Sequence, residues 1–233
     1  MVESTESAAP ADRIRTSGDS EVATYLEIAE AREPGQVLTP APNAPDAIAV
    51  IDFGSQYSML ITRRIREAGV YSELIAWDAT ADKLNHLNVK AFVLSGGPAS
   101  VYEDGAPTLP TYVLGSGVPV LGICYGMQLL THALGGRVEP ADSREYGQAV
   151  LNISDQTTEL LADLPSSMPV WMSHGDRIIE MPTGFRSIAQ SDNSPVAAMT
   201  DDAGHVAIQF HPEVVHTPQG KDLLANFLFK IAG

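Results

Sequence analysis

The chain has little of several residue types and patterns that define broad classes of protein. It contains one cysteine among 233 residues, which excludes an intrachain disulfide framework and a cysteine-rich zinc site. No apolar run reaches the roughly 18 residues that a membrane-spanning helix needs, so we expect no membrane partner. Basic residues are also scarce. The 14 lysines and arginines stand against 29 acids, and the net charge of −15 disfavours nucleic acid as a partner.

Phosphate-binding glycine patterns are missing as well. The sequence contains neither G-x-x-x-x-G-K-[ST] nor G-x-G-x-x-G at the start of a predicted helix, so we expect no ATP or dinucleotide site and no bound cofactor in this chain. We also expect no metal ion. With 44% hydrophobic residues, a chain of this length can bury a core of useful size without a metal.

Residues 1–46 differ in composition from the remainder. They carry nine acids against three arginines and end in the helix-breaking stretch Pro40-Ala-Pro-Asn-Ala-Pro45. Such a segment buries too little apolar surface to offset the entropy lost on ordering. We therefore expect 1–46 to be a disordered acidic, proline-rich extension with one helix at Val22–Arg32, without the features of a secretory or mitochondrial leader. The folded domain is predicted to cover 47–233.

From Ala47 onward, strand-like and helix-like segments alternate. Strands are expected at Ala47–Phe53, Val70–Trp77, Ala91–Leu94 and Val118–Ile123, and helices at Tyr57–Ala68, Ala81–Leu87, Leu109–Gly115 and Gln219–Ala232. This alternation predicts an α/β fold, in which a mostly parallel central sheet carries helices on both faces. The stretch from Arg137 to Phe210 is expected to add shorter, partly antiparallel strands as a smaller sheet.

The single cysteine lies in a strand–turn–helix pattern. Val118–Ile123 is a buried-strand sequence, and the turn that follows places Cys124 between Gly122 and Gly126 before an apolar helix. Glycines on both sides permit the close backbone approach of a nucleophile elbow. The positive end of the helix favours the thiolate, which is the reactive form. The alternative is that Cys124 is simply a small buried hydrophobic residue.

A base and its orienting partner are predicted close to the C-terminus. A segment with the alternating pattern of a strand contains His211 and, two positions later, Glu213. Side chains at i and i+2 of an extended segment share one face, so Glu213 can hold the imidazole while His211 faces the sulfur. Pro212 stiffens the turn between them. Taken alone, the pattern also fits a histidine at a strand end that a neighbouring carboxylate caps.

Backbone N–H groups are expected to complete the site. An apolar strand at Ala91–Leu94 ends in Ser95-Gly-Gly-Pro98, and Tyr125 directly follows the cysteine. The amides of Gly97 and Tyr125 are the natural pair of donors to a tetrahedral oxyanion. The alternative for the two glycines is an ordinary strand-to-loop turn.

These residues resemble a known family. F-x-L-S-G-G-P, G-x-C-x-G-x-Q and F-H-P-E occur in the order that is typical of class I, triad-type glutamine amidotransferases. Further segments resemble the GMP synthase branch of that family: Ile51-Asp-Phe-Gly-Ser-Gln-Tyr57, Trp171-Met-Ser-His-Gly-Asp176 and Gln209-Phe-His-Pro-Glu-Val-Val-His-Thr-Pro-Gln-Gly220. The resemblance covers residues 47 to 233.

The resemblance implies a flavodoxin-like fold and the hydrolysis of L-glutamine to glutamate and ammonia. In that family Cys124 would form a γ-glutamyl thioester, His211 would act as general base and acid, and Glu213 would orient it. Gly97 and Tyr125 would supply the oxyanion-hole amides.

The resemblance also implies contacts to the substrate and a partner. Gln128 would contact glutamine, and the backbone of Ser173, His174 and Gly175 would hold its α-amino and carboxylate groups. Asp176 completes the S-H-G-D segment, for which a role at the partner interface is one option. The ammonia would pass to an ATP pyrophosphatase domain or subunit that aminates XMP and binds ATP and Mg²⁺. A free catalytic thiol suits the cytoplasm.

Two alternatives stay open. The chain could be the glutaminase of anthranilate, aminodeoxychorismate or carbamoyl phosphate synthesis, although the two segments around Gly54 and His174 disfavour this. It could also be an inactive, amidotransferase-like binding module, which the complete set of Cys124, His211 and Glu213 disfavours.

Overall fold

The computed structural model describes residues 37–233. The predicted helix at Val22–Arg32 and the part of the predicted extension at 1–36 lie outside the described residues. The rest of that extension contacts the domain. The amide N–H of Ala41 donates to the carbonyl of Asn85 at 2.6 Å, and Leu38 packs against buried side chains. The stretch just before the first strand is therefore held by the domain.

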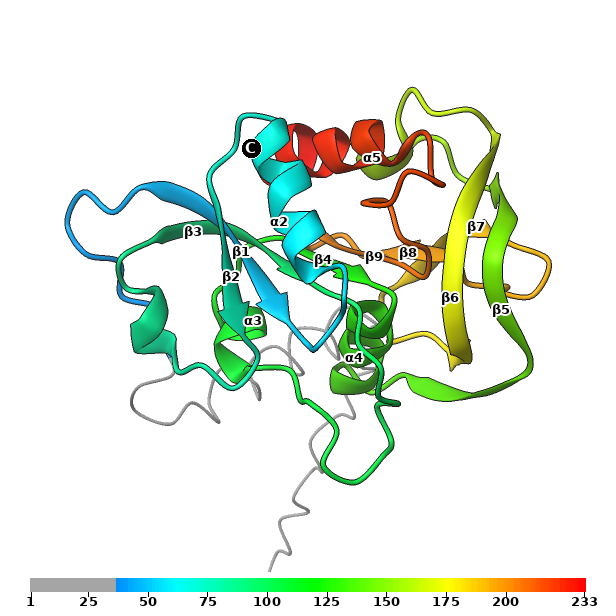
Figure 1. Ribbon diagram of the computed structural model, residues 1–233, viewed down its shortest axis with the longest axis horizontal. Coiled ribbons are helices and arrows are strands. Elements are labelled where there is room, and N and C mark those ends of the chain that lie inside the picture. Colours follow the sequence, from blue (N-terminus) through cyan, green and yellow to red (C-terminus); the bar gives the residue numbers. More distant parts are fainter. Residues whose placement is uncertain (1–36) are drawn as a thin grey trace, which may run out of the picture.

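Nine strands form one continuous sheet, as Figure 1 shows. They are β1 (Asp46–Asp52), β2 (Ser72–Ala76), β3 (Asn88–Leu94), β4 (Val120–Ile123), β5 (Arg137–Ile153), β6 (Ser167–Glu180), β7 (Arg186–Gln190), β8 (Ala198–Thr200) and β9 (His205–Ile208). Their spatial order is β2-β1-β3-β4-β9-β8-β7-β5-β6. The first five strands in this order are parallel, and the pairings from β9 to β6 are antiparallel.

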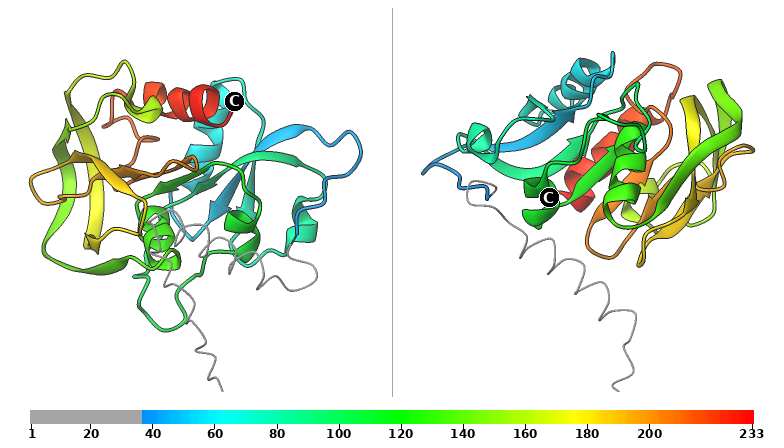
Figure 2. Two further views of the ribbon diagram at one scale, coloured as in Figure 1. Left: turned by 180° about the vertical axis from the view of Figure 1, so that it is seen from behind. Right: turned by 90° about the horizontal axis from the view of Figure 1, so that it is seen from below.

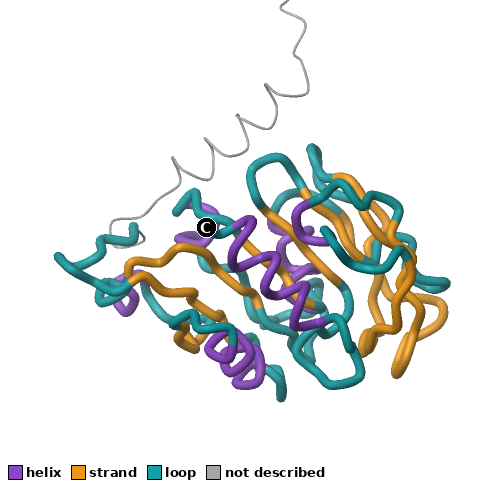
Figure 3. The backbone as a smooth tube through the Cα atoms, turned by 90° about the horizontal axis from the view of Figure 1, so that it is seen from above, coloured by secondary structure: helices purple, strands orange, loops and turns teal. Residues whose placement is uncertain are grey.

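Helices cover both faces of the parallel part. The helical segments are α2 (Ser58–Glu67), η1 (Ala81–Leu84), α3 (Thr111–Gly115), α4 (Tyr125–Ala133), η2 (Glu159–Leu161) and α5 (Gly220–Asn226), and α5 continues into the π-helical turn η3 (Phe227–Ile231). Helices α2 and α5 lie on one side of the sheet and α3 and α4 on the other (Figure 1). Seen from above, the C-terminal helix lies in front of the sheet (Figure 3). The predicted α/β fold is confirmed.

The two hydrophobic clusters follow from the two-residue period of a strand. On β1, Ile48 and Val50 pack on the side of α2, against Ile61 and Ile65. The intervening side chains of β1, such as Ile51, face the cluster on the opposite side. A parallel strand that is buried on both faces needs a continuous apolar sequence, which explains why β1 lacks the polar alternation of a surface strand.

The antiparallel part differs from the expected short strands of a smaller sheet. Strands β5 and β6 contain 17 and 14 residues, and they extend the central sheet (Figure 2). Strand β6 alternates buried and half-exposed positions, but His174 and Asp176 occupy two of the buried positions. Because polar residues fill these inward positions, the hydrophobic pattern underestimates the length of the strand. Among the described residues, no helix combines the length and apolarity needed to cross a bilayer.

The junction between β4 and α4 is packed without room for side chains. A Cβ atom added to Gly126 would lie 2.4 Å from the carbonyl oxygen of Leu94 on the neighbouring strand β3. One added to Gly122 would lie 2.8 Å from the carbonyl oxygen of Gly126. These contacts involve backbone atoms, which cannot move aside as the end of a flexible side chain can. The first turn of α4 can therefore approach β3 only because both positions are glycine.

Gly126→Ala should lower the free energy of unfolding by about 1–3 kcal/mol, because the new methyl group must push β3 and α4 apart. Chemical denaturation followed by circular dichroism measures this change. Gly175→Ala is the matched control, since its Cβ would meet only the side chain of Arg144 at 3.6 Å or beyond. We expect the control to stay within about 0.5 kcal/mol of the natural chain. Equal stability of the two variants would contradict the packing argument.

Candidate active site

Cys124 occupies a strained position between β4 and α4. Its backbone φ is 54° and its ψ is −109°, a region that residues other than glycine rarely adopt. The conformation is held in place, because its amide N–H donates to the carbonyl of Ile208 on β9 at 2.8 Å. The side chain is 5% exposed and its sulfur lies 3.6 Å from the carbonyl oxygen of Ser173. The sharp turn expected from the glycines is present.

His211 and Glu213 meet as predicted, although the backbone differs. Strand β9 ends at Ile208, so the pair lies in the loop that follows and not on a strand. The Nδ1 atom of His211 is 2.7 Å from Oε1 of Glu213, and both side chains are buried. The loop is fixed by other contacts. The amide N–H of His211 donates to the carbonyl of Trp171 at 2.9 Å, and the Nε of Arg64 donates to the carbonyl of Glu213 at 3.0 Å.

The protonation of His211 depends on both neighbours. Burial by itself lowers the pKa of the imidazole, because it disfavours the charged form. The side-chain hydrogen bond with Cys124 and then the one with Glu213 outweigh burial, and together with the negative charges of these groups they raise the pKa to about 10. The raised pKa favours the protonated form of His211 at neutral pH.

Two neighbouring cavities open onto the sulfur. The first, of about 300 Å³, is lined by Gly54, Ser55, Gln56, Tyr57, Gly97, Pro98, Cys124, Ser173 and His211. The second, of about 630 Å³, is bounded by the loop after β3, the start of α4 and strands β5 and β6. Cys124, Gly97 and Ser173 line both. A small molecule in either cavity can therefore reach the sulfur.

Gly97 and Tyr125, the two residues predicted to donate their amides, lie next to each other. A Cβ atom on Gly97 would be 2.8 Å from the carbonyl oxygen of Phe53 and 3.1 Å from the ring of Tyr125, so only glycine fits there. As the first residue of α4, Tyr125 has an amide N–H with no partner inside the helix. The preceding residue, Gly96, also lies close to the site, since a Cβ atom added to it would be 3.3 Å from the ring of His211. The chain thus places two backbone segments around the sulfur of Cys124.

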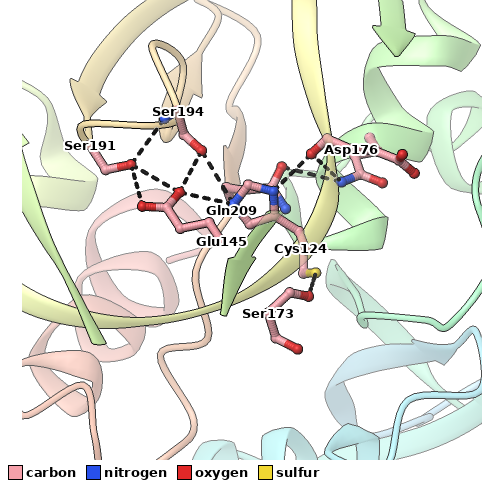
Figure 4. A network of polar contacts seen from close by, with 9 residues as sticks. Cys124, Glu145, Ser173, Asp176, Ser191, Ser194 and Gln209 are labelled. Carbon is pink, nitrogen blue, oxygen red and sulfur yellow. Dashed lines mark hydrogen bonds and ion pairs between the residues drawn. The ribbon is translucent and has the colours of Figure 1, made fainter. Parts of the chain in front are cut away.

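The remaining predicted residues join a polar network beside the sulfur, which Figure 4 shows. The side-chain amide of Gln128 donates to the carbonyl of Asp176 at 3.4 Å and to Oε1 of Gln209 at 3.3 Å. The imidazole of His174 uses Nδ1 toward the carbonyl of Asp176, at 2.8 Å, and Nε2 toward Glu145, at 3.2 Å. Because its ring is engaged in this way, His174 can offer only its backbone to a ligand, as can its neighbour Gly175.

Sequence reasoning missed a buried carboxylate behind the site. Glu145 on β5 is 7% exposed and accepts hydrogen bonds from the hydroxyls of Ser191 and Ser194 (Figure 4). These residues lie about 46 positions apart from it in the chain, and no local motif connects them. Tyr57 also lacked a predicted role, although it lies in the segment around Gly54. Its ring contacts that of His211 at 5.4 Å between centroids.

Metal ligands do not gather in the described part of the chain. Residues 37–233 contain no group of three or more histidine, cysteine, aspartate or glutamate side chains placed to hold an ion. The groups gathered at the site are the sulfur of Cys124, the imidazole of His211 with the carboxylate of Glu213, and backbone amides. This set is suited to acyl transfer.

Comparison with known families gives one match over most of the chain. The family model described as "Glutamine amidotransferase class-I" matches residues 49–231. This range includes the strand–turn–helix junction, the loop after β3 and the loop after β9.

Individual relatives have consistent names. A protein named "GMP synthase [glutamine-hydrolyzing]" from Dehalococcoides mccartyi is 56% identical over 186 residues, which are 80% of this chain and 35% of that protein. One of the same name from Thermomicrobium roseum is 55% identical over 82% of this chain and 36% of its own length. The chain therefore spans about a third of the length of these relatives.

Solved structures support the same fold. A crystal structure from Thermoplasma acidophilum, described as that of a GMP synthase subunit, is 30% identical, with a TM-score of 0.69 over 80% of this chain and 93% of that one. A glutamine amidotransferase from Thermotoga maritima, at 18% identity, has a TM-score of 0.63 over 82% of this chain and 99% of that one, and it shows the fold alone.

Glu213→Gln should lower the pKa of His211, because a neutral amide stabilises the imidazolium less than a carboxylate does. Cys124→Ala should lower it as well, because the side-chain hydrogen bond with Cys124 is the largest of the contacts that raise the pKa of His211. NMR titration of the ring protons measures both shifts, and the spectrum of His211→Asn assigns the signal. Glu139→Gln, which removes an exposed carboxylate paired with Arg137, is the control. An unchanged pKa in Glu213→Gln would contradict the assigned contact.

Proposed function

Because the chain belongs to the class I glutamine amidotransferase family, we propose that it hydrolyses L-glutamine to glutamate and ammonia through a thioester on Cys124. The observation that carries this proposal is the geometry around the sulfur. The chain places Cys124 at a strained elbow, beside an imidazole whose Nδ1 is 2.7 Å from the carboxylate of Glu213. An inactive binding module would have no reason to maintain such a strained arrangement.

The first half of the reaction forms the thioester. The thiolate of Cys124 attacks the side-chain amide carbon of glutamine, and the carbonyl oxygen becomes an oxyanion. The amides of Gly97 and Tyr125 stabilise this charge. His211 then gives its proton to the amide nitrogen, the carbon–nitrogen bond breaks, and ammonia leaves.

The second half restores the enzyme. Neutral His211 takes a proton from water, and the resulting hydroxide attacks the thioester carbon. The second tetrahedral intermediate uses the same two amides. Its collapse expels the thiolate of Cys124 and releases glutamate, and His211 keeps the proton for the next cycle. Throughout, Glu213 holds the imidazole in the required tautomer.

The larger cavity supports the binding of glutamine. Its wall includes Gln128, Ser173, His174 and Gly175, the four residues expected to contact the substrate. The backbone carbonyls and amides of β6 suit the charged α-amino and carboxylate groups, while the side-chain amide of the substrate points to Cys124. The side chain of Gln128 lies 3.4 Å from the carbonyl of Asp176 at the other end of this segment.

The destination of the ammonia is the finer part of the proposal. The similarity to proteins named GMP synthase, of which the chain matches about a third, supports transfer to an ATP pyrophosphatase partner that aminates XMP. ATP and Mg²⁺ bind to that partner. The same names disfavour a role in anthranilate, aminodeoxychorismate or carbamoyl phosphate synthesis. A catalytic thiol stays reduced in the cytoplasm, which is the compartment we assign to the reaction.

Cys124→Ala should reduce glutamate release by at least about 10³-fold, because no other group can form the thioester. Coupled detection of glutamate measures the rate, and circular dichroism checks that the fold is kept. A glutamine analogue with an electrophilic side chain should label the natural chain once, at its single cysteine. Glu213→Gln should reduce glutamate release less than Cys124→Ala or His211→Asn does, since it disturbs only the orientation of the imidazole. Near-normal activity of Cys124→Ala would overturn the covalent mechanism.

Glutamate release should rise when an XMP-aminating synthetase partner is added together with XMP and ATP–Mg²⁺, because ammonia made without an acceptor is lost. A partner can raise the rate only if it binds the active state of the site better than the inactive one. GMP should appear only with all components present. A high rate from the chain alone that the partner leaves unchanged would contradict coupling. GMP formation without a partner would contradict the assignment of the synthetase reaction to another chain or domain.

A further inference from the structure

The carboxylate of Asp176 connects two parts of the site that are far apart in the sequence. Asp176 lies on β6 and is 9% exposed. Its Oδ2 accepts a hydrogen bond from the hydroxyl of Ser100 at 2.5 Å, and its Oδ1 accepts one from the hydroxyl of Tyr102 at 2.7 Å. Both donors lie in the loop between β3 and α3, close behind Gly97. We call these two hydrogen bonds the Asp176 latch.

The loop that receives the latch is a unit with its own internal bonds. The amide of Ser100 donates to the carboxylate of Glu103 at 3.2 Å, and the amide of Glu103 donates back to the carbonyl of Ser100 at 3.0 Å. Further along, the hydroxyl of Tyr125 donates to the carbonyl of Pro107 at 2.6 Å. These bonds connect Ser100, which closely follows Gly97 in the chain, to Glu103, and they tie the far end of the loop to α4.

The position of Asp176 is itself fixed from the side of the protein core. Its carbonyl oxygen lies 2.8 Å from Nδ1 of His174 and 3.4 Å from Nε2 of Gln128. The other nitrogen of His174 contacts the buried carboxylate of Glu145. The latch therefore ties the loop to a buried network and not to a mobile surface group.

We propose that Asp176 is a positioning residue, which acts through Ser100 and Tyr102 to hold the amide of Gly97 toward the oxyanion that forms above Cys124. The inference rests on the proposed function, because only a reaction with an oxyanion needs that amide. Hydrogen bonds to a carboxylate are about twice as strong as those between neutral groups, so the latch is suited to fixing a loop. The sulfur of Cys124 contacts the carbonyl of Ser173 and, among the described contacts, none of the latch atoms, so we expect the latch to leave its reactivity unchanged.

Two reactions of Cys124 in the 233-residue chain distinguish an effect on the oxyanion from an effect on the reactivity of the sulfur. Glutamine hydrolysis passes through an oxyanion, whereas alkylation by iodoacetamide is a displacement at a saturated carbon and forms none. Tyr102→Phe and Asp176→Ala should lower kcat for glutamate release about tenfold or more. Both variants should leave the alkylation rate within about twofold of the natural chain. Asp176→Asn keeps one acceptor oxygen and should lose less than Asp176→Ala.

A matched control and a double variant complete the kinetic test. Tyr71→Phe removes a hydroxyl of similar exposure that also donates to a carboxylate, that of Glu73, on the distant strand β2. Its kcat should not change. Tyr102→Phe combined with Asp176→Ala should be no slower than Asp176→Ala alone, since both changes break one latch. Unchanged kcat in the latch variants, or equal losses in hydrolysis and alkylation, would overturn the proposal.

Hydrogen–deuterium exchange tests the latch without any activity. Peptides that cover residues 97–107 should exchange faster in Asp176→Ala and Tyr102→Phe than in the natural chain and in Tyr71→Phe. If the natural chain releases no glutamate, the proposed function fails, while faster exchange still supports the restraint on the loop. If the chain is active and neither exchange nor kcat responds to these substitutions, the latch is wrong and the glutaminase proposal stands.

Discussion

The site depends on the close contact between the start of α4 and strand β3. Gly126 lies so near the carbonyl of Leu94 that no side chain fits between them. This contact sets the sharp turn after β4, and the turn forces Cys124 into a positive φ. Two backbone hydrogen bonds hold this strained turn in place. The amide N–H of Cys124 donates to the carbonyl of Ile208 on β9, and the amide N–H of Gly126 donates to the carbonyl of Ser95, which directly follows β3. The sulfur of Cys124 is thus placed by backbone packing.

The rest of the site is arranged around that fixed sulfur by three loops at the carboxyl ends of parallel strands. The loop after β1 contributes Tyr57, the loop after β3 contributes Gly97, and the loop after β9 contributes His211. Strand β6 closes the opposite side with Ser173, whose carbonyl meets the sulfur. The parallel sheet brings the loops together, whereas the antiparallel extension supplies the wall that a substrate would bind. Both parts of the sheet are needed for one site.

Local sequence patterns predicted the parts of the structure that neighbouring residues determine. These are the elbow around Cys124, the pairing of His211 with Glu213 and the alternation of strands and helices. No pattern indicated Glu145, because its partners Ser191 and Ser194 come from another strand connection. The length of β6 was also underestimated, since buried polar groups interrupt its apolar period. Buried polar groups that hydrogen-bond across long sequence separations leave no local pattern in the sequence.

The central claim is that the chain transfers the acyl group of glutamine to Cys124, and trapping that intermediate tests it most directly. The chain is mixed with glutamine, quenched in acid during turnover, and analysed by mass spectrometry of its peptides. We expect the peptide containing Cys124 to gain the mass of one glutamyl group, and the gain to be absent in Cys124→Ala. Steady release of glutamate without any such adduct, or an adduct on another residue, would contradict the account.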